Sequence, residues 1–263
     1  MTALEFFIDG VGLWSPQLAD FADLRSVLDG KTPAPSPRRP AAATLPANER
    51  RRAPDSVLLA VEVAGQAVAM SGQGAAAVAC VFASSHGDQA ITDYMCATLA
   101  QAPTELSPIR FHNSVHNAAV GYWTIATGCH APSTAIAAQR ASFGAGLLEA
   151  ASQVCAEQRP VLLVCSDFVG TGPLLEVTGC TQAFGCALML MPVAGARSLA
   201  RLRLTLTNAR PSSTLDEPMA GWRDGNPSAA ALPLLALLAQ GRGRCQLEAA
   251  ARLGLQIDME KVA

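Results

Sequence analysis

The segment at residues 133–151, STAIAAQRASFGAGLLEAA, has the composition of a strand followed by an Ala- and Gly-rich helix, with Gln139 and Arg140 at the turn between them. A helix N-terminus leaves backbone N–H groups unpaired and carries a partial positive charge, so such a turn favours a nucleophile whose reaction develops negative charge. A glutamine amide is not a nucleophile. Two interpretations remain open: the Gln139 amide hydrogen-bonds to the helix N–H groups, or it mimics a bound acyl group.

Other residues with catalytic potential are scattered along the chain. All four histidines precede the turn: His86, His112, His116 and His130. The spacing of His112 and His116 predicts one shared helix face, but no third ligand has the spacing of a metal site, so we interpret both as packing or interface residues. Cys129 lies ten residues before Gln139, so it does not occupy the same helix N-terminus.

The composition limits the class of protein. Half of the 263 residues are hydrophobic and only 15% are charged, which is typical of closely packed helices and strands. The net charge of −2 argues against a nucleic-acid binder, and we interpret the basic run at residues 47–54 as a solvated loop. No signal peptide or membrane span is expected. The eight cysteines include no CxxC pair, which predicts reduced thiols, no zinc and a cytoplasmic location.

Apolar runs alternate with helical patterns, which predicts an α/β fold with a central helical layer. Strands are expected at residues 4–14, 76–85, 133–138, 160–168, 185–192 and 201–209, the first ending in a Gly-rich turn. Helices are expected at 20–31, 55–72, 88–101, 111–128, 140–156, 229–240 and 243–254, and loops at 32–53 and 211–230. The glycines at 10, 12, 144 and 146 complete no nucleotide-binding pattern, so we interpret them as packing or turn positions and expect no cofactor.

Five segments, taken in order, resemble the N-terminal half of the β-ketoacyl synthases, a family of the thiolase-like superfamily. They are FFIDGVGLWSP, DLRSVLDGK, SPIRFHNSVHNAAVGYWTIATGCHAPSTA, LLEAASQVCAEQRPVLLVCSD and FGCALMLMP. Asn117 and Gly121 match the spacing of the family's Asn and Gly. The resemblance implies a thiolase-like layered fold, mainly the N-terminal ketosynthase half with a truncated second half. We expect a ketosynthase-like domain at residues 1–205, with a loop and C-terminal helices at 206–263 packing on it.

The departures from the family are informative. An active ketosynthase has cysteine where this chain has Gln139 or, in an alignment shifted by one residue, Arg140. It also uses two histidines in its second half, which is mostly absent here. Family members with an emptied cysteine position are chain-length factors, which pair with an active ketosynthase and shape its product tunnel. The motifs SVHNA and GYW resemble the short, chain-length-factor-like subunits of aryl polyene and xanthomonadin-type pigment pathways.

The resemblance implies a non-catalytic subunit of a 3-oxoacyl-ACP synthase complex in iterative acyl or polyene biosynthesis. Its expected partners are a full-length catalytic β-ketoacyl synthase, in a heterodimer, and an acyl carrier protein. Ile91, Tyr94 and Met95 are expected to reach the partner's acyl tunnel. The expected interface residues are Phe111, Asn113, His116, Asn117, Tyr122 and Trp123. Two alternatives stay open: a divergent acyltransferase or thioester hydrolase that uses Cys129 or a serine with His130, and an acyl-carrier-protein-binding scaffold.

Overall fold

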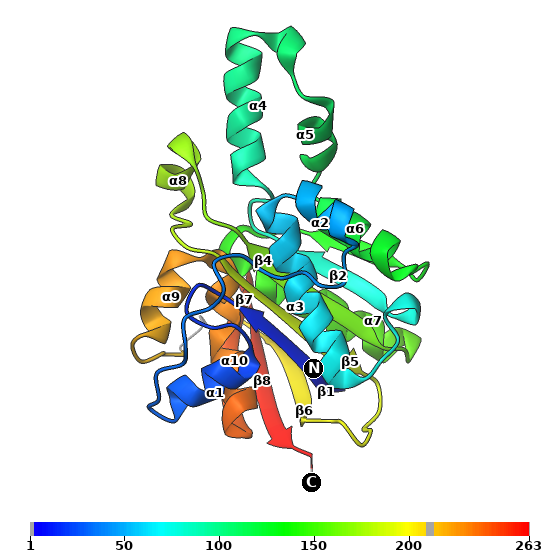
Figure 1. Ribbon diagram of the computed structural model, residues 1–263. Helices are drawn as coiled ribbons and strands as arrows, with labels where there is room; N and C mark the ends of the chain where they lie inside the picture. Colours follow the sequence, from blue (N-terminus) through cyan, green and yellow to red (C-terminus); the bar gives the residue numbers. More distant parts are fainter. Residues whose placement is uncertain (1–2, 209–212, 263) are drawn as a thin grey trace.

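The computed structural model describes residues 3–208 and 213–262, and one eight-stranded sheet forms its framework (Figure 1). The strand order is β3-β2-β4-β5-β1-β6-β8-β7. Strands β3, β2 and β4 are parallel, and the other neighbours are antiparallel. The strands are β1 Leu4–Trp14, β2 Ala79–Ala83, β3 Ser133–Ile136, β4 Val161–Asp167, β5 Phe184–Met191, β6 Ala200–Thr207, β7 Arg242–Ala250 and β8 Leu253–Lys261. The predicted α/β fold is confirmed.

The helices cover both faces of this sheet, and α4 and α5 stand away from the body as a projecting pair (Figure 1). None of the helices in the described part of the chain is long and apolar enough to cross a membrane. The helices are α1 Phe21–Leu28, α2 Ala47–Arg52, α3 Asp55–Ser71, α4 Gln89–Gln101, α5 Pro108–Asn113, α6 Ala118–Thr127, α7 Ser142–Glu157, α8 Gly172–Thr178, α9 Met219–Gly225 and α10 Leu232–Gln240, with 3-10 turns that include η3 Gln139–Ala141 and η4 Pro227–Ala231.

Helix α3 lies directly on β1 because two glycines make room for its backbone. A Cβ atom at Gly10 would lie 2.1 Å from the carbonyl oxygen of Ala67, and one at Gly12 would lie 1.9 Å from that of Val63. The packing role predicted for these glycines is therefore confirmed. The Gly-rich turn predicted after the strand is wrong, because β1 continues through both glycines to Trp14.

Helix α7 is enclosed between two parts of the same sheet. Gly144 and Gly146 are two residues apart, so they point to nearly opposite sides of the helix. A Cβ atom at Gly144 would lie 2.0 Å from the carbonyl oxygen of Glu248 in β7, and one at Gly146 would lie 3.2 Å from the Cβ of Ala83 in β2. The sheet therefore bends around α7, which confirms the predicted central helical layer.

The predicted helix at residues 243–254 is wrong, because these residues belong to the β7–β8 hairpin. The run EAAAR contains strong helix formers, which explains the prediction. In the structure Cys245, Leu247 and Ala249 are buried in alternation along β7. Burial with a period of two, together with pairing of β8 to β6, overrides the local preference. The C-terminal segment therefore extends the sheet and contributes one helix, α10, of the two that were predicted.

Three smaller predictions also change. The helix predicted at 111–128 is divided into α5 and α6, so His112 and His116 do not share a helix face. The basic run is not a loop but the short helix α2. The loop predicted at 211–230 contains α9, and residues 211 and 212 lie outside the described residues.

The close approach at α7 predicts a large effect of one methyl group. Gly144→Ala is expected to lower the free energy of unfolding by about 3 kcal/mol or to prevent folding, because the new Cβ would overlap the Glu248 carbonyl oxygen. Urea denaturation of the purified chain measures this. Gly121→Ala in α6 is the matched control, since a Cβ there meets no atom within 4 Å, and it is expected to stabilise by up to about 1 kcal/mol. Equal effects of the two variants would contradict the packing described.

Candidate functional site

The turn between β3 and α7 has a strained backbone. Gln139 has a φ of 51°, in the left-handed region that costs a residue with a side chain on the order of 1–2 kcal/mol. It opens the turn η3, which leads into α7. A sharp, strained strand-to-helix turn is the geometry that exposes a nucleophile at a helix N-terminus. Arg140 is not among the residues with positive φ, so Gln139 alone has the conformation of the apex.

Two serines hold this turn through the backbone of Gln139. Its carbonyl oxygen accepts hydrogen bonds from the Oγ atoms of Ser85 and Ser142, each at 2.6 Å. Ser142 Oγ also accepts a bond from the backbone N–H of Ala138, at 2.9 Å. The Gln139 side chain is exposed, and the hydrogen bonds found for this residue within the described chain use its backbone. The predicted bonding of its amide to the helix N–H groups is therefore not observed.

Asp167, at the end of β4, is a buried carboxyl group that accepts four hydrogen bonds. Its side chain is 1% exposed. Oδ1 accepts from Ser84 Oγ and from the backbone N–H groups of Ser85 and His86, at 2.8, 2.8 and 3.2 Å. Oδ2 accepts from Ser228 Oγ at 2.6 Å. The carboxyl group thus joins the loop after β2, which contacts the turn at Gln139, to η4 in the C-terminal part.

Two features of the surroundings of Asp167 have opposite effects on its acidity. Burial raises the pKa of Asp167, and hydrogen bonds from Ser228, Ser84 and the His86 N–H counteract this rise.

The neighbouring Asn226, fully buried, donates from Nδ2 to the carbonyl oxygens of Asp167 and Gln182, each at 2.8 Å. The sequence signal for this buried group, which was not among the predicted site residues, is an Asp that ends an apolar strand, VLLVCSD.

The structure gives no support to Cys129 as a substitute nucleophile. Cys129 precedes β3 whereas Gln139 follows it, so the two lie at opposite ends of that strand. Cys129 is 7% exposed and its Sγ donates to the carbonyl oxygen of Val78. Burial, followed by the proximity of Cys129, raises the pKa of the adjacent Cys80 to about 12. His130 is exposed beside Cys129, also remote from the turn.

The three residues expected to gate a tunnel lie on α4. Ile91 is 8% exposed, and Tyr94 and Met95 are half-buried. The Tyr94 hydroxyl accepts a hydrogen bond from the backbone N–H of Ser107 at 3.1 Å, and the Arg110 guanidinium lies 3.9 Å from the centre of its ring. Tyr94 therefore holds α5 against α4 within this chain.

The expected interface residues divide into surface and interior groups. Phe111, His116 and Asn117 are exposed, and Tyr122 is half-buried. Asn113 and Trp123 are only 5% and 1% exposed, because Trp123 packs in the core between α6, α3 and β2 and Asn113 accepts a bond from the Tyr122 hydroxyl. A direct contact of these two side chains with another protein, as predicted, is therefore not available on this surface.

The same region exposes large apolar side chains that the sequence analysis did not single out. We call them, with Phe111, the apolar surface: Ile109, Phe111, Val115 and Ile125, exposed by 51%, 57%, 52% and 84%. Three of them line a groove of about 600 Å³ with residues of α2 and α6. The strand that follows α6 in the chain, β3, is an edge strand with β2 as its neighbour in the sheet. Exposed apolar side chains and an open sheet edge are both typical of protein–protein interfaces.

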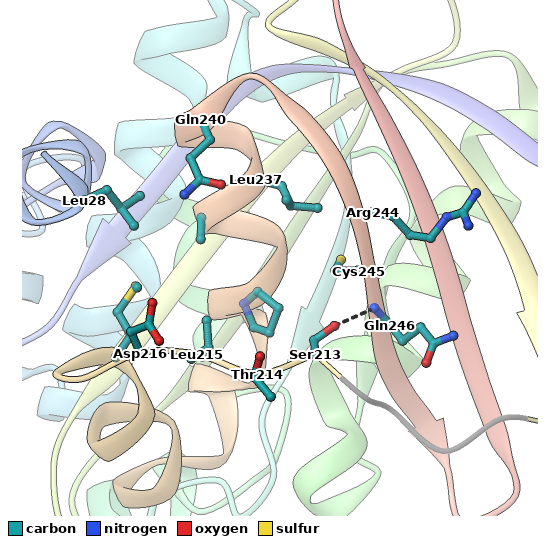
Figure 2. Close-up of a pocket in the computed structure, with 13 residues that line it drawn as sticks. Leu28, Ser213, Thr214, Leu215, Asp216, Leu237, Gln240, Arg244, Cys245 and Gln246 are labelled. Atoms are coloured by element: carbon teal, nitrogen blue, oxygen red, sulfur yellow. Dashed lines mark hydrogen bonds between the residues drawn. The ribbon is translucent and has the colours of Figure 1, made fainter.

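A second cavity, of about 430 Å³, lies between β7, α10 and residues 213–216 (Figure 2). Ser213 Oγ accepts a hydrogen bond from the backbone N–H of Gln246 at its rim, at 2.8 Å. None of the expected site residues lines it. In the described ranges no three His, Cys, Asp or Glu side chains are grouped so that they could hold a metal ion.

The layered sheet, the enclosed helix and the strained turn define the thiolase-like ketosynthase fold. Residues 28–253 match the family model "Beta-ketoacyl synthase, N-terminal domain", and this chain belongs to the β-ketoacyl synthase family. No protein of curated function matches the sequence. The family and fold predicted from the sequence are thereby confirmed.

Solved structures agree with this assignment. One chain of the ketosynthase (ApeO) in complex with its chain length factor (ApeC) from Xenorhabdus doucetiae has a TM-score of 0.73 and 25% identity, covering 97% of this chain and 99% of that chain. The ishigamide ketosynthase/chain length factor has a TM-score of 0.72 and 14% identity, covering 98% and 99%. The PfaC keto synthase–chain length factor has a TM-score of 0.61 and 11% identity, covering 100% of this chain and 43% of that one. The last two show the fold alone.

The Asp167 cluster predicts graded effects of substitution. Asp167→Ala is expected to lower the free energy of unfolding by about 3 kcal/mol or more, because four donors lose a buried acceptor. Asp167→Asn is expected to recover much of the loss, since its carbonyl replaces Oδ1 and its amide donates to Ser228. Asp224→Ala, at a side chain 81% exposed, is the control. Chemical denaturation compares the three, and an Ala variant as stable as the control would contradict the role of Asp167.

Proposed function

We propose that this chain is a non-catalytic, chain-length-factor-like partner of an active β-ketoacyl-ACP synthase. The observation that carries the proposal is Gln139 at the apex of the strained turn. The family and fold supply the position for a nucleophile, while the residue there has no nucleophilic group. The similarity to a chain of the ApeO–ApeC complex, over nearly the full length of both chains, supports the same conclusion.

The proposed pathway is iterative acyl or polyene synthesis of the aryl polyene or xanthomonadin type. Sequence motifs support this assignment, together with the similarity to the ApeO–ApeC complex at 25% identity. An acyltransferase or hydrolase that uses Cys129 is disfavoured, because that thiol is buried at the far end of β3. A carrier-protein scaffold without a synthase partner would leave the apolar surface without a function.

We propose that the partner synthase binds at β3 and the apolar surface. Within the described residues β3 has a neighbouring strand on one side alone, and Ile125 is 84% exposed on α6. Stable obligate interfaces bury roughly 2,000 Å² or more and have an apolar centre, which these elements can supply. The opposite edge strand, β7, instead carries the exposed charged residues Arg242, Arg244 and Glu248. Partner binding is therefore proposed at one end of the molecule.

An acyl carrier protein is the second proposed partner, and α2 supports its docking. Five arginines fall within residues 38–52, although the whole chain has a net charge of −2. We call three of them, all in α2, the arginine surface: Arg50 is half-buried, and Arg51 and Arg52 are exposed. An acidic surface of a carrier protein is complementary to this charge.

The missing nucleophile predicts no turnover by the chain alone. Incubation with acyl- and malonyl-carrier-protein is expected to yield no β-ketoacyl product above background by mass spectrometry. Gln139→Cys is expected to remain inactive, because all four histidines precede the turn and no pair from a second half accompanies the new thiol. Product formation by the wild-type chain without a partner would overturn the proposal.

Introducing a charge into the apolar surface is expected to separate the partners. Ile125→Glu should reduce co-purification with a full-length catalytic ketosynthase partner by at least about tenfold, because a buried unpaired carboxylate costs several kcal/mol. Val193→Glu is the control, at another exposed apolar residue (63%) beyond the end of β5. Loss of the partner in the control alone, or in neither variant, would place the interface elsewhere.

A role of α4 in chain length predicts a change in products. We propose that Met95 reaches toward the partner's tunnel, while Ile91 and Tyr94 hold α4 in place. Met95→Ala in the reconstituted pair is expected to lengthen the product, since burying two more methylenes gains roughly 1.5 kcal/mol, about tenfold in an equilibrium. Cys96→Ala, at the adjacent exposed position, is the control. Unchanged product lengths with an intact complex would assign Met95 to ordinary packing.

A further inference from the structure

We propose that Glu62, on α3, is a positioning residue that holds the arginine surface in its docking conformation. This inference rests on the proposed docking of an acyl carrier protein at that surface. Within the described residues, no hydrogen bond or ion pair joins Glu62 to any of the three arginines. It acts through Ala42, at the start of the segment that leads to α2.

The backbone at Ala42 is strained and buried. Its φ is 45° and its side chain is 0% exposed. Its N–H donates to Glu62 Oε2 at 2.6 Å, a bond to a charged acceptor. A strained backbone persists only where its surroundings determine it. The Glu62 carboxylate is the side chain that determines it here.

Glu62 is itself fixed to the core of the fold. Its Oε1 accepts a hydrogen bond from Gln66 Nε2 at 3.0 Å. The same amide of Gln66 donates to the carbonyl oxygen of Ala19 and accepts, at Oε1, from the backbone N–H of Leu13 in β1, each at 3.0 Å. Hydrogen bonds through two α3 side chains, Glu62 and Gln66, therefore connect Ala42 to the central sheet.

The segment after Ala42 transmits this position to the arginines. The N–H of Leu45 donates to the Ala42 carbonyl oxygen at 3.0 Å. The guanidinium of Arg50 donates to the Ala41 carbonyl oxygen at 3.3 Å. Helix α2 has only six residues, none buried, and no side-chain cap. So short a helix is not stable by itself. Its orientation therefore depends on the segment that Glu62 anchors and on the buried Ala53 that follows it.

Glu62 could affect carrier-protein binding through its position or through its charge. Removing its carboxylate has opposite effects on binding in the two cases, so the two roles can be distinguished. Removing a negative charge close to a cationic surface strengthens the attraction of an acidic partner. Removing the anchor of Ala42 leaves the arginines mobile in the free protein. Docking is then weaker, because ordering these side chains on binding costs free energy. If loss of the Glu62 carboxylate weakens carrier-protein binding, the cause is therefore its positioning role and not its charge.

The experiment measures binding of a fatty-acid-type holo-acyl carrier protein to the full chain in complex with its ketosynthase, by fluorescence anisotropy. Glu62→Ala is expected to weaken binding by roughly fivefold. Glu62→Gln keeps an oxygen for the Ala42 N–H and is expected to bind as wild type or more tightly. The matched control is Glu149→Ala on α7, because Glu149 accepts the same type of bond from the residue four positions on, Gln153, at 2.9 Å. It is expected to bind as wild type.

A second measurement separates this inference from the docking proposal. The double variant Arg51→Glu, Arg52→Glu is expected to weaken binding at least tenfold and to reduce its salt dependence; Arg252→Glu is its control. Wild-type affinity of the double variant would overturn docking at the arginine surface, and the role of Glu62 with it. If the double variant is weakened but Glu62→Ala binds as wild type or more tightly, the positioning role alone is overturned. Amide exchange at residues 41–45 is expected to be faster in Glu62→Ala but not in Glu149→Ala.

Discussion

The enclosure of α7 between two parts of one sheet is the constraint on which the rest of the structure depends. Gly144 lies against the backbone of β7 and Gly146 faces β2 and β4, so at these two positions the helix has little or no room for a side chain. Its position fixes the turn at its N-terminus, where Gln139 lies. Two serines then tie that turn to its surroundings through the Gln139 carbonyl oxygen. The site keeps the architecture for a nucleophile although the residue at its apex has none.

Asp167 extends this constraint across the chain. Its carboxyl group binds the loop after β2, and Asn226 and Ser228 bring the C-terminal part to the same point. Because the group is buried, each of these bonds is costly to lose. The N-terminal and C-terminal segments are thus joined beside the candidate site.

The two ends of the sheet differ in a way that bears on assembly. On the outer face of β1, β6, β8 and β7, each pair of neighbouring strands is joined by an ion pair. These are Glu5–Arg203, Arg201–Glu260 and Arg244–Asp258. Exposed pairs add little stability, but they keep this face hydrated. At the other end, β3 is open and the apolar surface is exposed. The outer face at the β7 end of the sheet is therefore polar, whereas four large apolar side chains are exposed together at the proposed interface.

The sequence by itself determined the α/β class, the family, the order of the first six strands and the turn at Gln139, because these follow from local apolar runs and motifs. Only the tertiary structure decided that 243–254 is a hairpin, that Trp123 is internal, and that Gln139 rather than Arg140 has the strained conformation. Asp167 acquired its role in the same way, from partners that lie far apart in the chain. Each of these outcomes depends on contacts between distant segments, whose burial and hydrogen bonding outweigh the local preferences that a sequence displays.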